Sequence, residues 1–272
     1  MRTDIILSAS GLIKTYRQRS GRFGFGATII KALDDVSISV KQGGTLAVVG
    51  ESGSGKSTLA RCLLQLQPLD AGEVLFEGRD LAALSGKELR AVRRNLQMVF
   101  QDPFASLNPR MKVGDIVGEG LVIHGLGDAQ ERRVKAVRML ERVGLAASDM
   151  GKYPHEFSGG QRQRIGIARA LVLQPKVVVC DEPVSALDVS IQAQILLLLK
   201  ELQHEMGLSY VFISHDLRVV RHVADEVVVM HRGRVVEQGA VEDLYANPRQ
   251  EYTQNLLNAI PGRHRQAAWK LA

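Results

Sequence analysis

The sequence contains little cysteine, and its two cysteines, Cys62 and Cys180, lie far apart in a chain of 272 residues. Neither has a partner at the spacing of metal ligands, and two isolated thiols do not make a disulfide framework. This cysteine usage indicates a reducing compartment. Because Cys62 falls in a helical pattern and Cys180 ends an apolar run, we expect both to be small buried hydrophobic residues.

Long hydrophobic runs are also absent. The longest, such as Ile195–Leu199, are far shorter than the roughly 20 residues that a membrane-spanning helix needs. The first residues, Met1–Ile6, carry no signal-peptide pattern. We therefore expect a soluble chain, which other chains hold in place if it works at a membrane.

Blocks of like charge are missing as well, although 35 Lys and Arg outnumber 29 Asp and Glu and give a net charge of +6. A basic balance suits an anionic partner such as a nucleotide, a nucleic acid or a membrane surface. The basic residues are nevertheless spread along the chain, so we favour a mildly basic soluble protein. The Arg-Arg pairs at 93–94 and 132–133 fall in helical patterns and are interpreted as solvated faces.

What the sequence does contain is a glycine-rich loop between a predicted strand at 46–49 and a predicted helix from residue 59. Glycines let backbone N–H groups surround phosphates, and the helix N-terminus adds positive partial charge. Lys56 supplies a charge for the β- and γ-phosphates, and the Ser57 hydroxyl can ligate Mg²⁺. An ordinary glycine turn would leave this Lys-Ser pair unexplained, so the loop predicts nucleoside triphosphate binding. Its residues are Gly50, Glu51, Ser52, Gly53, Ser54, Gly55, Lys56, Ser57 and Thr58.

Alternation of strand and helix patterns around this loop predicts an α/β core with a mostly parallel sheet. The hydrophobic content of 45% is enough for one large domain or a core with a subdomain. Residues 103–157 look mainly helical and charged, and are interpreted as an inserted helical subdomain. We expect helices capped at Ser85 and Asp188, the second ending at Gly207. Strands are expected at 5–7, 32–40, 72–78, 97–100, 177–180 and 210–213, and an exposed loop at 18–26.

Two further segments carry phosphate chemistry. An apolar strand at 177–180 ends in Asp181, which we assign to Mg²⁺, and Glu182, which is placed to act as general base on a water. A solvated strand end would not account for two adjacent acids in a chain with this loop. Ser158 and Gln161 form a capping-box pattern at a helix start, and Gly159 and Gly160 leave the N–H groups open to a phosphate. Taken by itself, this pattern indicates a plain helix cap.

The order of these motifs resembles that of ATP-binding cassette (ABC) ATPases from about residue 5 to residue 260. The Ser-Gly-Gly-Gln at 158–161 matches the family signature, and Ser185–Asp188 matches the D-loop. Gln101 matches the Q-loop, His215 the switch histidine, and Tyr16 the aromatic residue that stacks on adenine. Val184 departs from the family pattern, where threonine is common, but it lies outside the metal and base positions.

The resemblance implies a P-loop NTPase (RecA-like) core with an N-terminal antiparallel β subdomain. It places an ABC ATPase domain at 5–260, with its core at 5–102 and 161–242, a helical subdomain at 103–160 and a C-terminal extension at 243–272. Two such chains pack head to tail around ATP, so the signature residues Ser158, Gly159, Gly160 and Gln161 contact the partner's ATP. The residues implied to act on the chain's own ATP are Tyr16, Lys56, Ser57, Gln101, Asp181, Glu182 and His215, with Ser57, Gln101 and Asp181 at Mg²⁺.

Two segments narrow the resemblance to one group of importers. Residues 101–111 and 252–261 resemble the corresponding stretches of dipeptide, oligopeptide and nickel importers. This implies two membrane permeases, a second ABC ATPase subunit, an external solute-binding protein and a peripheral position on the cytoplasmic face of a bacterial membrane. It also implies no nucleic-acid partner. Because no cysteine follows Cys180, we expect no iron–sulfur cluster of the kind that some members of the group carry.

Other functions remain open at this point. A soluble ABC protein acting on nucleic acid or ribosomes is the main alternative, although such proteins usually carry two cassettes or a long coiled-coil insertion. The importer-like segment at 101–111 disfavours an exporter ATPase. The transported solute is determined by other chains and is not specified by this sequence. Whether the second cassette is an identical chain is also open.

Overall fold

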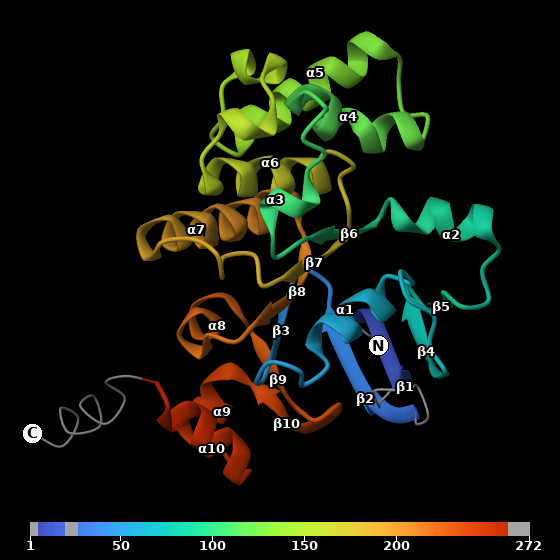
Figure 1. Ribbon diagram of the computed structural model, residues 1–272, viewed down its shortest axis with the longest axis vertical. Helices are drawn as coiled ribbons and strands as arrows, with labels where there is room; N and C mark the ends of the chain where they lie inside the picture. The colour runs from blue at the N-terminus through green and yellow to red at the C-terminus, as the bar shows by residue number, and fades with distance from the viewer. Residues whose placement is uncertain (1–4, 20–26, 261–272) are drawn as a thin grey trace, which may run out of the picture. The chain divides into compact units, whose positions relative to one another are not determined.

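The computed structural model describes residues 5–19 and 27–260, which fall into two compact units. The first unit joins the residues up to Ala83 with those from Val211 onward, and the second is Leu84–Tyr210. The boundary therefore lies inside strand β8 (Ser209–Ser214). Figure 1 shows the chain coloured from blue at the N-terminus to red at the C-terminus, so the elements of each unit can be found by their labels and colours.

The first unit contains an antiparallel sheet with the strand order β2-β1-β4-β5. Its two long strands pair along most of their length, with register shifts between Ala9 and Leu12 and between Leu12 and Thr15. The predicted strands at 5–7 and 32–40 were therefore too short. The predicted loop was too long, because residues 18 and 19 belong to β1; its positions 20–26 lie outside the described residues. The strands are β1 (Ile5–Arg19), β2 (Ala27–Lys41), β4 (Ala71–Phe76) and β5 (Arg79–Asp80).

A second sheet of the first unit has the order β10-β9-β3-β8. β3 (Thr45–Val49) pairs parallel with β9 (Glu226–His231), whose other neighbour is antiparallel β10 (Arg234–Ala240). All five residues of β3 are buried, as the apolar run before the glycine-rich loop predicted. The helices of this unit are α1 (Lys56–Leu63), α8 (Leu217–Val223), α9 (Val241–Ala246) and α10 (Glu251–Asn258).

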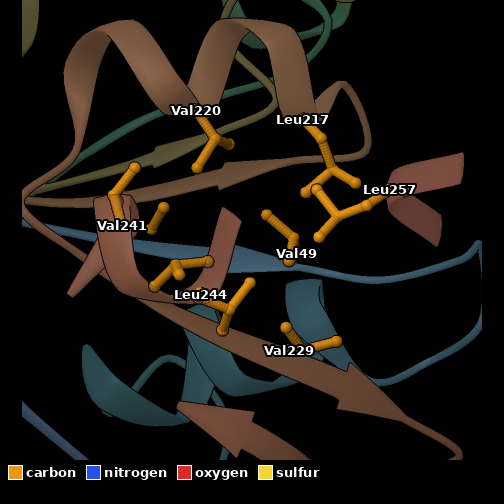
Figure 2. Close-up of a cluster of buried hydrophobic side chains, with 9 residues drawn as sticks. Val49, Leu217, Val220, Val229, Val241, Leu244 and Leu257 are labelled. Carbon is orange, nitrogen blue, oxygen red and sulfur yellow. The ribbon is translucent and has the colours of Figure 1, made fainter. Parts of the chain in front are cut away.

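One hydrophobic cluster joins α8, α9 and α10 to β3, the strand that leads into the glycine-rich loop. Val49 of β3 packs in the same cluster as Val229 of β9, Leu217 of α8 and Leu257 of α10 (Figure 2). Leu257 is fully buried there. The C-terminal helix is thus part of the core beneath the glycine-rich loop.

The second unit combines a parallel strand pair with a group of helices. β6 (Leu96–Val99) pairs parallel with β7 (Val177–Asp181). Helices α4, α5 and α6 pack against one another, which confirms the helical character predicted for the middle of the chain (Figure 1). The helical elements are α2 (Gly86–Arg93), α3 (Pro103–Ser106), α4 (Val113–Ile123), α5 (Ala129–Arg142), η1 (Ala147–Gly151), η2 (Pro154–Glu156), α6 (Gly159–Leu171) and α7 (Val189–Met206).

The predicted helix ends at Ser85, Asp188 and Gly207 are all confirmed, although one of them lacks the expected side-chain cap. Ser85 and Glu88 form the predicted capping box, and α7 ends at Gly207 in the left-handed conformation. Asp188 stands at the N-cap position of α7, but its side chain makes no capping hydrogen bond. Separately, the Gln192 side-chain amide donates to the carbonyls of Val184 and Leu187 at 3.0 Å each.

Both cysteines are buried, as predicted. Burial raises the pKa of the Cys62 thiol to about 11 and also raises that of Cys180, so both stay protonated at neutral pH. Among the residues that the structure describes, no helix is long and apolar enough to cross a lipid bilayer.

Candidate functional site

The glycine-rich loop at 50–58 has neighbours that leave no room for a side chain at Gly50 or Gly55. Gly50 and Gly55 have φ angles of 149° and 106°, in the range that L-residues rarely adopt. A Cβ on Gly50 would lie 2.1 Å from the Met230 carbonyl oxygen, and one on Gly55 would lie 2.3 Å from that of Ala32. β9 and β2 thus hold the loop against their backbones, which explains the glycines beyond their flexibility.

Lys56 is buried at the base of this loop, with 5% of its surface exposed. Its ammonium donates to the carbonyl oxygens of Gly50 and Glu51 at 2.8 Å each, and lies 3.5 Å from the Ser54 hydroxyl. A buried cation needs such acceptors. The side chain is therefore curled back over the loop, with its charge against the loop's carbonyl oxygens.

The N-terminus of α1 fits a polyphosphate. Its N-cap is Gly55, which has no side chain to accept from the first-turn N–H groups, and the first turn holds no acidic residue. The helix dipole at an N-terminus without a side-chain cap favours an anion. Ser57 and Thr58 lie in this first turn and are half-buried.

Two other predicted site residues belong to the same unit. Tyr16 is half-buried on β1, with the Lys14 ammonium 5.9 Å from its ring centroid. His215 is exposed directly after β8. Asp70 fixes the backbone before Tyr16, because its carboxylate accepts from the Thr15 N–H and hydroxyl at 2.7 Å each and from Lys14 at 2.9 Å.

The Asp70 contacts predict a pH-dependent contribution to stability. Hydrogen bonds from Thr15 and Lys14 lower the pKa of Asp70 to about 2. A lowered folded-state pKa stabilises the fold above the unfolded value near 3.9, and that stabilisation is lost as the pH falls through about 2. Asp70→Asn is therefore expected to lower the thermal midpoint at pH 7, and the difference should vanish towards pH 2.

Thermal unfolding monitored by circular dichroism between pH 2 and pH 7 measures this effect. Asp80→Asn is a suitable control, because Asp80 accepts only a local backbone bond from Ala82 among the contacts recorded for it. A difference between Asp70→Asn and the parent chain that is constant across this pH range would contradict the role given to Asp70.

In the second unit, the acidic pair stands at the end of β7. Asp181 is the last strand residue and is 5% exposed. Glu182 is half-buried and has a φ of 47°, which is uncommon for a residue with a side chain. The Ser185 hydroxyl donates to its carbonyl oxygen at 3.1 Å. Such strain is held by the surrounding structure and is characteristic of functional positions.

The structure brings two of the predicted residues together. The Gln101 side-chain amide donates to the Glu182 carboxylate at 3.2 Å, although 81 residues separate them in the chain. Gln101 follows β6, Glu182 follows β7, and these strands are parallel neighbours. Their carboxyl ends therefore meet at one edge of the sheet, which brings this amide and this carboxylate together.

The signature segment opens α6 as predicted. The Ser158 hydroxyl accepts from the Gln161 N–H at 3.4 Å, and the Gln161 side-chain oxygen accepts from the Ser158 N–H at 3.0 Å. Gly160 has a second reason to lack a side chain, because a Cβ there would lie 2.6 Å from the Ile191 methyl group on α7. The glycines thus serve both helix packing and access to the helix N-terminus.

The chain on both sides of Gln101 exposes aromatic side chains next to arginines. Asp102 caps α3 by accepting from the Phe104 N–H at 2.7 Å. Phe104 is 61% exposed and its ring lies 3.9 Å from the Arg162 guanidinium. Phe100 is also exposed, with Arg169 5.7 Å from its ring. Exposed aromatic rings beside arginines are typical of protein–protein interfaces.

Sequence reasoning missed one side chain at the glycine-rich loop. The Tyr252 hydroxyl on α10 accepts from the Glu51 N–H at 3.2 Å. Tyr252 had been noted only as part of an importer-like segment. No local pattern signals a contact across 201 positions.

Comparison with known proteins gives one family and several close relatives. The model of the family described as "ABC transporter" matches residues 33–185. The oligopeptide transport ATP-binding protein AppF of Bacillus subtilis is 52% identical over 95% of this chain and 79% of its own length. The dipeptide transport ATP-binding protein DppF of Haemophilus influenzae is 53% identical over 94% of this chain and 78% of its own length.

A solved structure shares the fold. It is the ATP-binding cassette MJ0796 in a dimeric post-hydrolysis state bound to ADP and Pi. Its TM-score is 0.75 at 31% identity, and the match covers 86% of this chain and 98% of that one.

Proposed function

Because the chain belongs to the ABC transporter family, we propose that it is the ATP-hydrolysing subunit of a bacterial importer for peptides or a related small solute. The single observation that carries the enzymatic part is the strained Glu182, whose carboxylate is bonded to Gln101. A strained, half-buried carboxylate at the end of a parallel strand is a placement suited to general-base catalysis. The peptide class is supported by the names of the relatives.

In ATP hydrolysis, different residues would bind the nucleotide, hold Mg²⁺ and act as general base. The N–H groups of the loop at 50–58 and the Lys56 ammonium would bind the phosphates, while Tyr16 would stack on the adenine. Ser57, Gln101 and Asp181 would hold Mg²⁺, which shields the phosphate charge when bound. Glu182 would then take a proton from the attacking water.

Two residues complete the proposal for turnover. His215 would contact the γ-phosphate, and Gln101 would orient the water through its bond to Glu182. Both carry side chains that can donate hydrogen bonds to the negative charge that develops during phosphate transfer.

We propose that the active form contains two cassettes. The signature residues at 158–161 of one chain would contact the ATP held by the other, as the dimeric state of MJ0796 illustrates for that protein. Two permeases would bind the exposed Phe100 and Phe104 segment, and a solute-binding protein would deliver the cargo. The chain would then sit on the cytoplasmic face of the membrane, with the subdomain limits predicted at 103–160 and 243–272.

Affinity purification from detergent-solubilised membranes of the native bacterium tests the importer assignment. We expect the tagged chain to retain two integral membrane subunits and a second cassette. The purified complex, reconstituted in vesicles, should couple ATP hydrolysis to uptake of a peptide. Truncating Phe100 and Phe104 together to alanine should lower recovery of the membrane subunits by about tenfold or more, because buried aromatic anchors dominate interfaces.

Leu197→Ala is the matched control for the double truncation. Leu197 is an exposed apolar side chain, at 60% against 61% for Phe104, and it belongs to α7 rather than to the segment that carries the two rings. Recovery of ribosomes or nucleic acid without membrane subunits would overturn the importer assignment. The transport names of the relatives already disfavour that alternative.

A further inference from the structure

One peptide group in the glycine-rich loop is held from both sides. It is the peptide that joins Gly50 to Glu51. Its carbonyl oxygen accepts from the Lys56 ammonium at 2.8 Å. Its N–H donates to the Tyr252 hydroxyl at 3.2 Å. Tyr252 and Lys56 are therefore linked through a single planar unit, because the two ends of a peptide move together.

The Tyr252 ring is itself firmly placed. It stacks on the His231 ring, with centroids 4.0 Å apart and planes inclined by 16°. His231 ends β9, the strand whose Met230 carbonyl lies against Gly50. Stacked rings of this kind keep their relative orientation and contribute beyond the area they bury.

The helix that carries Tyr252 is anchored at both ends. Leu257 is fully buried in the cluster around Val49, and Figure 2 shows its side chain beside Leu217. At the start of the helix, the Glu237 carboxylate of β10 accepts from the N–H groups of Arg249 and Gln250 at 2.8 and 3.1 Å. Contacts that do not involve the loop thus attach α10 to the core and to β10.

The Tyr252 hydroxyl is suited to act as an acceptor for a backbone N–H. Burial raises the pKa of Tyr252 above its ordinary value, so the phenol is neutral at physiological pH. A neutral phenol oxygen accepts from the Glu51 N–H without adding a negative charge close to the phosphates. A carboxylate in the same place would repel them.

We propose that Tyr252 is a positioning residue for nucleotide binding, which holds the Gly50–Glu51 peptide so that the loop keeps its shape when Lys56 turns from the loop carbonyls to phosphate. The inference rests on the proposed role of this loop in binding ATP. The C-terminal helix thereby acts on the site through one backbone hydrogen bond. Without that bond, the peptide is free to rotate after Lys56 leaves it, and part of the binding energy is lost in ordering the loop.

Tyr252→Phe tests this directly, because it removes the hydroxyl and keeps the ring on His231. For the full-length chain, we expect the Kd for Mg·ATP to rise about three- to tenfold, the effect of one hydrogen bond. In the reconstituted transporter, KM for ATP should rise by a similar factor while kcat changes little. Hydrogen exchange of the peptide that contains the Glu51 amide should accelerate in the nucleotide-free chain.

Tyr245→Phe is the matched control. The Tyr245 hydroxyl donates to the Leu217 carbonyl within the same unit, and its ring packs on the same cluster, so its loss tests the stability of that cluster. It should leave Kd, KM and Glu51 exchange unchanged, even if its thermal midpoint falls as much as that of Tyr252→Phe. Such a result separates positioning of the loop from general stability.

Two outcomes keep the inference and the proposed function apart. If the parent chain binds Mg·ATP and Tyr252→Phe binds it equally well, with unchanged exchange at Glu51, the positioning role is wrong and the ATPase assignment stands. If the parent chain itself fails to bind Mg·ATP, the assignment of the loop fails, and with it the inference.

Discussion

Glu182→Gln is expected to lower ATP turnover by roughly 10²- to 10⁴-fold, the usual contribution of a general base, while ATP binding is kept. Glutamine has nearly the same shape, so its side-chain oxygen can still accept from the Gln101 amide that lies 3.2 Å from the present carboxylate. The strained φ of 47° at this position is also unaffected. Only the ability to take a proton is removed. ATP should therefore stay trapped, and transport should stop.

Steady-state ATPase assays of the reconstituted transporter measure the loss, and nucleotide retention after gel filtration measures the trapping. Glu201→Gln is the control, because Glu201 is an exposed glutamate on α7 in the same unit and has no place in the proposed chemistry. Normal turnover by Glu182→Gln in the assembled complex would show that the base is another group.

Gly55→Ala is expected to disrupt the loop by collision as well as by strain. Its Cβ would lie 2.3 Å from the Ala32 carbonyl oxygen, and backbone cannot give way as a flexible side chain can. A φ of 106° adds conformational strain. Together, strain and overpacking of this kind cost about 2 to 6 kcal/mol. We expect a lower unfolding midpoint and a loss of Mg·ATP binding of at least tenfold, because α1 must shift.

Gly78→Ala separates the two causes. Gly78 has a comparable left-handed φ of 77°, but a Cβ there meets no atom within 4 Å. It should show only the strain, about 1 to 2 kcal/mol, with ATP binding intact. Equal losses in urea unfolding and equal ATP affinity for the two variants would mean that the close approach of β2 has no part in shaping the loop.

The elements that sequence reasoning predicted well are those whose signals are local. The glycine-rich loop lies between a buried strand and a helix as expected, and the Ser158–Gln161 capping box forms where the four-residue pattern indicated. Gly207 ends α7 because a left-handed residue is needed there. Each of these depends on residues no more than a few positions apart.

The features that sequence reasoning missed depend on partners far away in the chain. β1 runs on to residue 19 because β2 supplies hydrogen bonds to a segment whose side chains alternate poorly. The Tyr252 contact requires α10 to dock under the loop, which no local pattern specifies.

The curled position of Lys56 determines how much free energy this side chain contributes to ATP binding. In the structure its ammonium already has two carbonyl acceptors at 2.8 Å, so a phosphate that recruits it replaces bonds rather than adding them. The net gain from this exchange is small for a ligand that offers one weak acceptor, and larger for one that offers several charged oxygens together. Lys56 is thereby better suited to discriminate between anions than to capture any anion, and simple salts should compete poorly with a triphosphate.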